Sequence, residues 1–239
     1  MPDYEQLLEN FYRHLLRPGD VAIDAGAHVG RHTVPIARAV APGGTVFAFE
    51  PLPFAREALE NAVAGNAAVV VQPYALADRD GEDEFVVAVD LPAYSGLRTR
   101  IYDGPTRLHR IRVDVRTLDG LFADAERLDY VKIDAEGGEL GILRGATELL
   151  RRFRPVVTFE FGANSLGDYG ITVEDMADFW SELPFAIFDI LQRPLTRDAL
   201  IQSAKKQEVW DYVAVPVDRV NEILRHWRGV CVAGDGKVY

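Results

Sequence analysis

The chain has 239 residues, of which 48% are hydrophobic and 10% aromatic, which is enough for a buried core. Its length suits one α/β domain with extensions. The formal net charge of -11 disfavours a nucleic-acid partner, because an acidic chain repels a phosphate backbone unless it carries a local basic patch. No apolar run reaches the length of a membrane span, and residues 1–16 are too acidic for a signal peptide, so we expect no membrane association.

The cysteine content indicates the compartment. Cys231 is the single cysteine, so no internal disulfide can form, and the sequence has no zinc-ligand spacing. We therefore expect a reducing, cytoplasmic environment. Nothing in the sequence indicates the oligomeric state.

The first part of the chain alternates strands and helices. Apolar residues at helical spacing predict a helix over residues 7–16, which Pro18 and Gly19 end. Strands are then predicted over 21–24, 45–49 and 67–71, and helices over 31–40 and 54–64. This order implies a parallel sheet with crossover helices.

The middle of the chain interrupts that alternation. Strands over 84–89 and 111–115, separated by a loop rich in Pro, Gly, Tyr and Arg, predict an inserted hairpin-like element. The alternation then resumes, with strands over 130–134, 156–161, 186–191 and 209–215 and helices over 139–153 and 173–183. The last strand is expected to be antiparallel, because hardly any helix precedes it.

A glycine-rich turn, DAGAHVG over residues 24–30, follows the first of the parallel strands. Glycine lets the backbone turn tightly and approach a ligand without a Cβ in the way. The next strand ends at Glu50, where an acid is placed to accept hydrogen bonds from both ribose hydroxyls of an adenosine ligand. The pair Asp24 and Glu50 therefore indicates a nucleoside site, since such sheets bind ligands at the carboxyl ends of their strands. The alternatives are a capping or turn role for Asp24 and a solvated strand-end acid at Glu50.

A second group of charged residues ends the strand over 130–134. Lys132 and Asp134 point to one face, because side chains alternate along a strand. A lysine inside a central parallel strand is costly unless it is paired, so we expect an ion pair with Asp134 or Glu160. Asp134 stands at the carboxyl end of its strand, which favours a functional role. Glu136 either begins a helix, where acids suit the first turn, or faces the same crevice as Glu160.

The predicted insert is locally basic in an acidic chain. It carries Arg98, Arg100, Arg107, Arg110 and Arg112 together with Tyr94, Tyr102 and His109. One interpretation is a solvated loop. The other is a lid over an acceptor pocket, with arginines that meet an anionic or polyhydroxylated substrate.

Five consecutive motifs resemble the FkbM family of methyltransferases over about residues 20–165: DAGAHVG, FAFEP, YALADRDGEDEFVV, RTLDGL and YVKIDAEGGELGILRGA. The resemblance implies a Rossmann-like class I methyltransferase fold. We expect a mostly parallel seven-stranded sheet with helices on both faces and the insert, residues 82–116, between strands 3 and 4. The expected single domain comprises an N-terminal helix (1–19), the FkbM-like core (20–165) and the C-terminal part of the sheet (166–239).

The resemblance also implies S-adenosylmethionine as the methyl donor. It places Asp24, Gly26 and Gly30 at the methionine and sulfonium end and Glu50 at the ribose. The full set of expected donor-binding residues is Asp24, Gly26, Ala27, His28, Gly30, Glu50, Pro51, Tyr74, Ala75, Leu76 and Asp134. His28 departs from the family, which often has asparagine there, and it adds a titratable group.

The expected reaction is O-methylation of a small-molecule hydroxyl, in a secondary metabolite or a glycan, as the resemblance implies. A hydroxyl acceptor benefits from a base, and Asp134 and His28 are the catalytic candidates. The expected substrate-binding residues are Glu136, Glu160, Tyr94, Arg98 and Arg100. Asp134 and Glu160 offer oxygens to a divalent metal, but without a dense Asp/Asn cluster we expect metal independence.

Two other functions compete with this interpretation. An NAD-dependent oxidoreductase also has a glycine turn and an acid on the second strand, but the turn lacks the GxGxxG spacing. A non-catalytic Rossmann-like binding module is the second alternative. The presence of Glu50 and of the charged residues over 132–136 counts against a decayed site.

Overall fold

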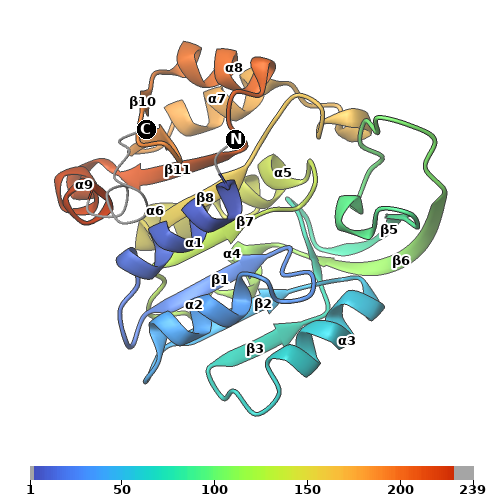
Figure 1. Cartoon of the computed structure of the whole chain (residues 1–239), viewed down its shortest axis with the longest axis horizontal. Helices are drawn as coiled ribbons and strands as arrows, with labels where there is room; N and C mark the ends of the chain where they lie inside the picture. Colours follow the sequence, from blue (N-terminus) through green and yellow to red (C-terminus); the bar gives the residue numbers. More distant parts are fainter. Residues whose placement is uncertain (1–2, 229–239) are drawn as a thin grey trace.

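The computed structural model describes residues 3–228, which form a large sheet between two layers of helices, with a smaller sheet at its side (Figure 1). The elements are α1 (Tyr4–Leu15), β1 (Val21–Ala25), α2 (Thr33–Val40), β2 (Thr45–Phe49), α3 (Pro53–Ala62), β3 (Val69–Gln72), β4 (Ala75–Leu76), β5 (Gly81–Ala88), η1 (Pro92–Tyr94), β6 (Leu108–Arg116), α4 (Leu118–Leu121), β7 (Tyr130–Ile133), α5 (Glu139–Arg144), α6 (Thr147–Phe153), β8 (Val156–Glu160), η2 (Gly167–Tyr169), α7 (Val173–Ser181), β9 (Phe185–Asp189), β10 (Pro194–Leu195), α8 (Arg197–Lys206), β11 (Asp211–Pro216), η3 (Val217–Arg219) and α9 (Val220–Arg228).

The large sheet has the strand order β10-β9-β11-β8-β7-β1-β2-β3. The strands β8, β7, β1, β2 and β3 are parallel to one another, whereas β11 is antiparallel to both of its neighbours. The predicted α/β class is therefore confirmed, with the difference that the sheet is mixed and carries an eighth, two-residue strand, β10. The antiparallel direction predicted for the last strand is also confirmed, but the reason given for it is wrong, because α8 precedes β11.

The insert is a small sheet of its own. β5 and β6 pair antiparallel along their whole length, and β4 adds to β6 in parallel. Both predicted insert strands are confirmed and are longer than expected. Phe85, Val113 and Val115 bury the inner face of this sheet against Leu52 and Ala55 of the β2–α3 region, which places the insert beside the carboxyl end of β2.

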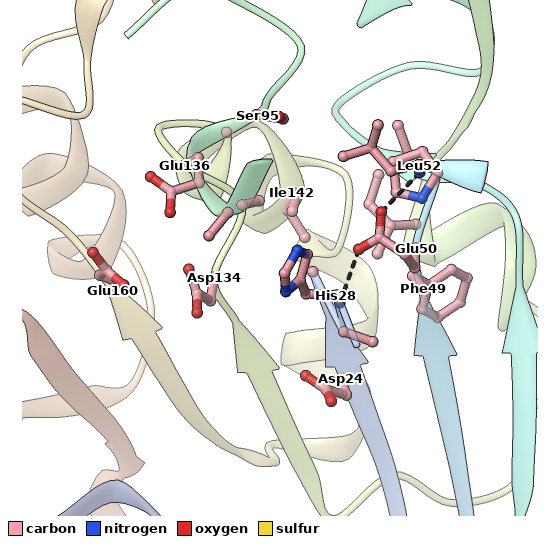
Figure 2. A pocket seen from close by; sticks show the side chains of 18 of the residues that line it. Asp24, His28, Phe49, Glu50, Leu52, Ser95, Asp134, Glu136, Ile142 and Glu160 are labelled. Carbon is pink, nitrogen blue, oxygen red and sulfur yellow. Dashed lines mark hydrogen bonds between the residues drawn. The ribbon is translucent and has the colours of Figure 1, made fainter. Parts of the chain in front are cut away.

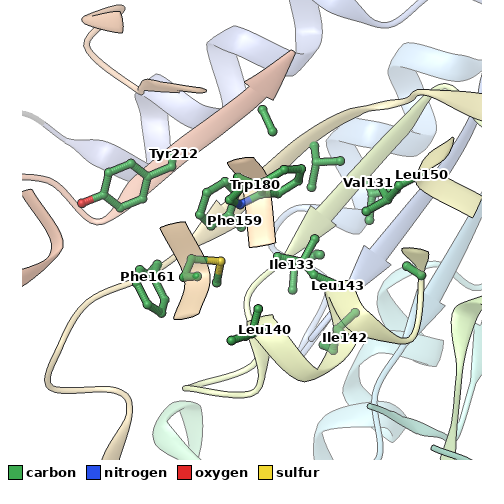
Figure 3. Close-up of a cluster of buried hydrophobic side chains, with 14 of the residues drawn as sticks. Val131, Ile133, Leu140, Ile142, Leu143, Leu150, Phe159, Phe161, Trp180 and Tyr212 are labelled. Atoms are coloured by element: carbon green, nitrogen blue, oxygen red, sulfur yellow. The ribbon is translucent and has the colours of Figure 1, made fainter. Parts of the chain in front are cut away.

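Two hydrophobic cores hold the large sheet between its helices. On one face Phe159 of β8 packs against Trp180 of α7 and Tyr212 of β11, with ring centroids 5.4 and 5.5 Å apart (Figure 3). On the other face Phe11 and Tyr12 of α1 are buried in a second cluster with residues of α2 and α9. Burying one such large apolar side chain contributes about 1.5–3 kcal/mol to folding.

The structure also divides a predicted helix. The stretch over 139–153 forms α5 and α6, which meet at Gly145. A Cβ at Gly145 would lie 2.1 Å from the carbonyl oxygen of Ala77, so the chain passes too close there for any larger residue. α8 and α9 were not predicted. Cys231 and the rest of residues 229–239 lie outside the described residues. Within residues 3–228, no helix is both long and apolar enough to cross a membrane.

Candidate functional site

A cavity of about 430 Å³ opens where the parallel strands end (Figure 2). Glu160, Asp134, His28 and Glu50 lie across its floor in that order, which follows the strand order β8, β7, β1 and β2. Of the expected donor-binding residues, the cavity is lined by Asp24, Gly26, Ala27, His28, Glu50, Pro51, Tyr74, Ala75, Leu76 and Asp134. Gly30 is not among the described residues that line it. The carboxyl ends of neighbouring strands thus bring these residues together.

The turn after β1 lies directly against the end of β7. Gly26 has φ +81°, and a Cβ on it would lie 1.7 Å from the carbonyl oxygen of Asp134. The main-chain N–H groups of Gly26 and Ala27 both donate to the carbonyl oxygen of Phe49, at 3.1 and 3.0 Å. Only glycine fits this approach, so Gly26 sets the distance between the two strand ends.

His28 occupies the left-handed backbone region, with φ +46°. Asparagine and histidine adopt this region more readily than most residues, so the backbone at this position suits asparagine as well as histidine. The ring atom Nε2 of His28 is buried and has no hydrogen-bond partner within residues 3–228. Burial lowers the pKa of His28, and the nearby carboxylate of Asp134 opposes this only in part.

Glu50 is a buried carboxylate with both oxygens held by the backbone. Its Oε1 accepts from the N–H of Leu52 at 2.7 Å, and its Oε2 accepts from the N–H of His28 at 2.8 Å (Figure 2). Burial raises the pKa of Glu50 to about 7, although the two N–H donors oppose the shift. Each oxygen keeps a further lone pair with which it can accept from a ligand.

The buried lysine of β7 is paired as expected. Lys132 Nζ lies 3.2 Å from Asp134 Oδ2 and 3.6 Å from Asp24 Oδ1. Burial disfavours the ammonium, but the carboxylates of Asp134 and Asp24 offset this and raise the pKa of Lys132 above its ordinary value. The ion pair with Asp134 is confirmed, and Asp24 is the second partner instead of Glu160. Asp24 also accepts from Thr33 Oγ1 at 2.6 Å, so it ties β1 to α2 beneath the cavity.

Sequence reasoning missed Glu139, which organises the turn after β7. Its Oε1 accepts from the N–H groups of Ala135 and Gly137, at 2.9 and 3.0 Å. Burial raises its pKa to about 7. Glu136, which lines the cavity, is held between these residues with φ +53°. An acid in the first turn of a predicted helix was the available signal, because such an acid often bonds free N–H groups.

Asp211 was also missed. It stands opposite Glu160 in the β11–β8 ladder, so two carboxyl groups meet beside Asp134. Burial and the charge of Asp134 raise the pKa of Asp211 to about 8. Burial, Asp134 and Asp211 likewise raise the pKa of Glu160 well above its usual range. In the part of the chain that the structure describes, no group of three or more His, Cys, Asp or Glu side chains is arranged to hold a metal ion.

The arginines of the insert are matched by acids. The exposed pairs are Arg107 with Asp90, Arg110 with Glu84 and Arg112 with Glu82, and the half-buried Arg98 pairs with the half-buried Asp83. Arg100 is buried, pairs with Glu136 and lies over the ring of Tyr94, 4.5 Å from its centroid. Tyr94 lines the cavity, whereas Arg98 does not line it among the described residues. Arg100 lines a second, adjacent cavity of about 350 Å³.

Known proteins resemble this chain in sequence and in fold. Residues 24–193 match the family described as the methyltransferase FkbM domain. The structure of a methyltransferase FkbM from Methylobacillus flagellatus KT superposes with a TM-score of 0.52 at 17% identity, covering 90% of this chain and 55% of that one. This chain therefore spans about half the length of that protein, and the likeness shows the fold alone.

Two further structures show weaker likenesses. An S-adenosylmethionine-dependent O-methyltransferase from Thermotoga maritima is 14% identical, with a TM-score of 0.47, over 90% of this chain and 65% of that one. Fibrillarin from Aeropyrum pernix is 11% identical, with a TM-score of 0.48, over 88% and 74%. A comparison with curated proteins gives no significant match. The family match covers well over half of the chain and includes the turn after β1, the end of β2 and the turn after β7. The chain belongs to the FkbM family of methyltransferases.

Proposed function

We propose that the protein transfers a methyl group from S-adenosylmethionine to the hydroxyl oxygen of a small-molecule acceptor. The observation that carries the donor assignment is the buried Glu50, whose two oxygens are fixed by backbone N–H groups at the wall of the cavity. A carboxylate in this position accepts hydrogen bonds from a ribose at the end of the second strand.

Other features of the cavity fit the same donor. Its volume of about 430 Å³ lies in the range of small-molecule sites. Acidic side chains outnumber lysine and arginine among the described residues that line it, which suits a cationic sulfonium. Between Glu50 and Asp134, the side chain of His28 adds a ring nitrogen, Nε2, that has no hydrogen-bond partner among the described residues. Tyr74, Ala75 and Leu76 are the proposed neighbours of the adenine.

The donor supplies an activated methyl group, whose bond to sulfur breaks as the bond to the acceptor oxygen forms, leaving neutral S-adenosylhomocysteine. We assign Asp134 the larger catalytic role: ion-paired with Lys132, it accepts a hydrogen bond from the acceptor hydroxyl and orients it. His28 has a lowered pKa and is therefore neutral at pH 7, so its unpaired ring nitrogen receives the hydroxyl proton.

Membership in a methyltransferase family decides against the NAD-dependent oxidoreductase. Isothermal titration calorimetry with S-adenosylhomocysteine and NAD, side by side, tests the donor assignment. We expect binding of S-adenosylhomocysteine alone. Binding of neither ligand would favour the non-catalytic module. A secondary metabolite or glycan as the acceptor, the cytoplasmic location and independence from metal remain proposals.

A further inference from the structure

The second cavity meets the first at two side chains. Its volume is about 350 Å³, and it lies between the insert and the C-terminal part of the large sheet. Tyr94 of η1 and Glu160 at the end of β8 line both cavities. Two hydrogen bonds close the second cavity against the β8–α7 connection: Ile101 N donates to Asn164 O at 3.2 Å, and Asp168 N donates to Thr99 O at 2.8 Å.

The wall of the second cavity exposes apolar surface. Leu91, Tyr94 and Ile101 are 43%, 43% and 59% exposed, although large apolar side chains normally lie inside a protein. Trp210, just before β11, adds a half-buried indole to the same wall. Apolar and aromatic side chains that line a concave surface indicate a ligand with an apolar face.

The same wall contains an unused hydrogen-bond acceptor. The side-chain oxygen Oδ1 of Asn164 is buried, and the described part of the chain offers it no hydrogen-bond partner. A buried carbonyl oxygen without a partner is costly, so a ligand hydroxyl that donates to it gains free energy on binding. Glu160 provides a second polar group at the junction of the two cavities.

The charges of this cavity disfavour an anion. Arg100 is the one cationic side chain among the described residues that line it, and Glu136 already neutralises that charge. The guanidinium also packs on the ring of Tyr94 and so helps to fix the side chain that separates the two cavities. Asp103 supplies a carboxylate to the same wall, which repels a phosphate or carboxylate.

We propose that the second cavity is the acceptor site and that it takes an uncharged, hydroxylated molecule with an apolar face. This inference rests on the proposed methyl transfer. The reacting hydroxyl passes between Glu160 and Tyr94 into the first cavity. Asn164 Oδ1 accepts a hydrogen bond from another hydroxyl, and Trp210 covers the apolar face. Asn164 and Trp210 are therefore residues that determine acceptor specificity.

The fluorescence of Trp210 in the full chain provides the test. Trp180 and Trp227 are buried in the hydrophobic cores, so a ligand in the second cavity changes the emission of Trp210, and Trp210→Phe confirms the source of the signal. The probes are phenyl β-D-glucoside and phenyl β-D-glucuronide, which differ by a carboxylate in place of a hydroxymethyl group. Asn164→Ala removes the proposed acceptor atom. Arg112→Ala, on an exposed part of the insert, is the matched control.

We expect the glucoside to change the Trp210 emission and the glucuronide to bind about tenfold more weakly or worse. Asn164→Ala weakens glucoside binding about tenfold, and Arg112→Ala leaves it unchanged. If neither probe changes the fluorescence emission of Trp210, the second cavity is not the acceptor site. Equal or tighter binding of the glucuronide would overturn the uncharged class, and an unaffected Asn164→Ala would overturn the role of Asn164. Binding of S-adenosylhomocysteine is measured by calorimetry in parallel. Absence of binding would contradict the proposed donor. The fluorescence result with the two probes would still decide whether the second cavity is the acceptor site.

Discussion

The main-chain N–H of His28 donates to Oε2 of Glu50 at 2.8 Å and thereby joins the turn after β1 to the end of β2. The left-handed backbone of His28 aims that N–H at the carboxylate. The backbone N–H of His28 holds the carboxylate of Glu50, whereas its imidazole is the proposed proton acceptor. Substitutions at His28 and at Glu50 distinguish these two roles.

Glu50→Ala is expected to weaken binding of S-adenosylmethionine by about 1–3 kcal/mol, the usual cost of losing hydrogen bonds to a charged group. Glu57→Ala removes an acid from an exposed position of α3 and serves as the control for the change in net charge. Calorimetry measures both. Donor affinity in Glu50→Ala equal to that of the wild-type protein would show that the ribose assignment is wrong.

Asp134→Asn is expected to lower kcat by about 10²-fold or more, within the range for acid–base groups. His28→Asn is expected to be milder, because asparagine also adopts the left-handed backbone and keeps the N–H that Glu50 accepts. The measurement is kcat against pH for the wild type and both variants, at saturating donor. An inactive His28→Asn beside a fully active Asp134→Asn would reverse the two roles.

The pKa of Asp211 gives a prediction about stability. Its folded-state pKa of about 8 lies above the unfolded value, so the folded state binds the proton more tightly and loses stability as the pH rises from about 4 to about 8. Asp211→Asn keeps the shape without the charge. It should raise the melting temperature at pH 9 and change it little at pH 4. Asp198→Asn, on the exposed start of α8, is the control, and an equal effect of Asp211→Asn at both pH values would contradict the burial argument.

Metal removal tests the proposed independence from divalent cations. Dialysis against EDTA is expected to leave methyl transfer unchanged, because the carboxylate of Asp134 already forms an ion pair with Lys132 and does not need a metal ion to balance its charge. Activity that disappears with EDTA and returns with Mg²⁺ would overturn this proposal.

The alternation of strands and helices, the insert and most of the residues that line the first cavity were predictable, because they follow from local patterns. Apolar runs that end in Asp24, Glu50 and Asp134 converge at one edge of a parallel sheet. The remaining features depend on contacts between distant segments. Asp211 reaches Glu160 only through the register of an antiparallel strand, and Arg100 reaches Glu136 only after the insert folds back. The sequence shows the arginines of the insert as a basic segment, but it does not show the acids that pair with them.

Mass spectrometry of the small-molecule product tests the central claim most directly. The full chain is incubated with S-adenosylmethionine carrying a trideuterated methyl group and with fractions of a small-molecule cell extract. We predict one new product whose mass exceeds that of its precursor by a trideuteromethyl group in place of one hydrogen, attached to oxygen, and no such product with Asp134→Asn over the same time. Label on nitrogen or carbon, or an extract that stays unlabelled while the protein binds the donor, would contradict the proposed O-methyl transfer to a small molecule.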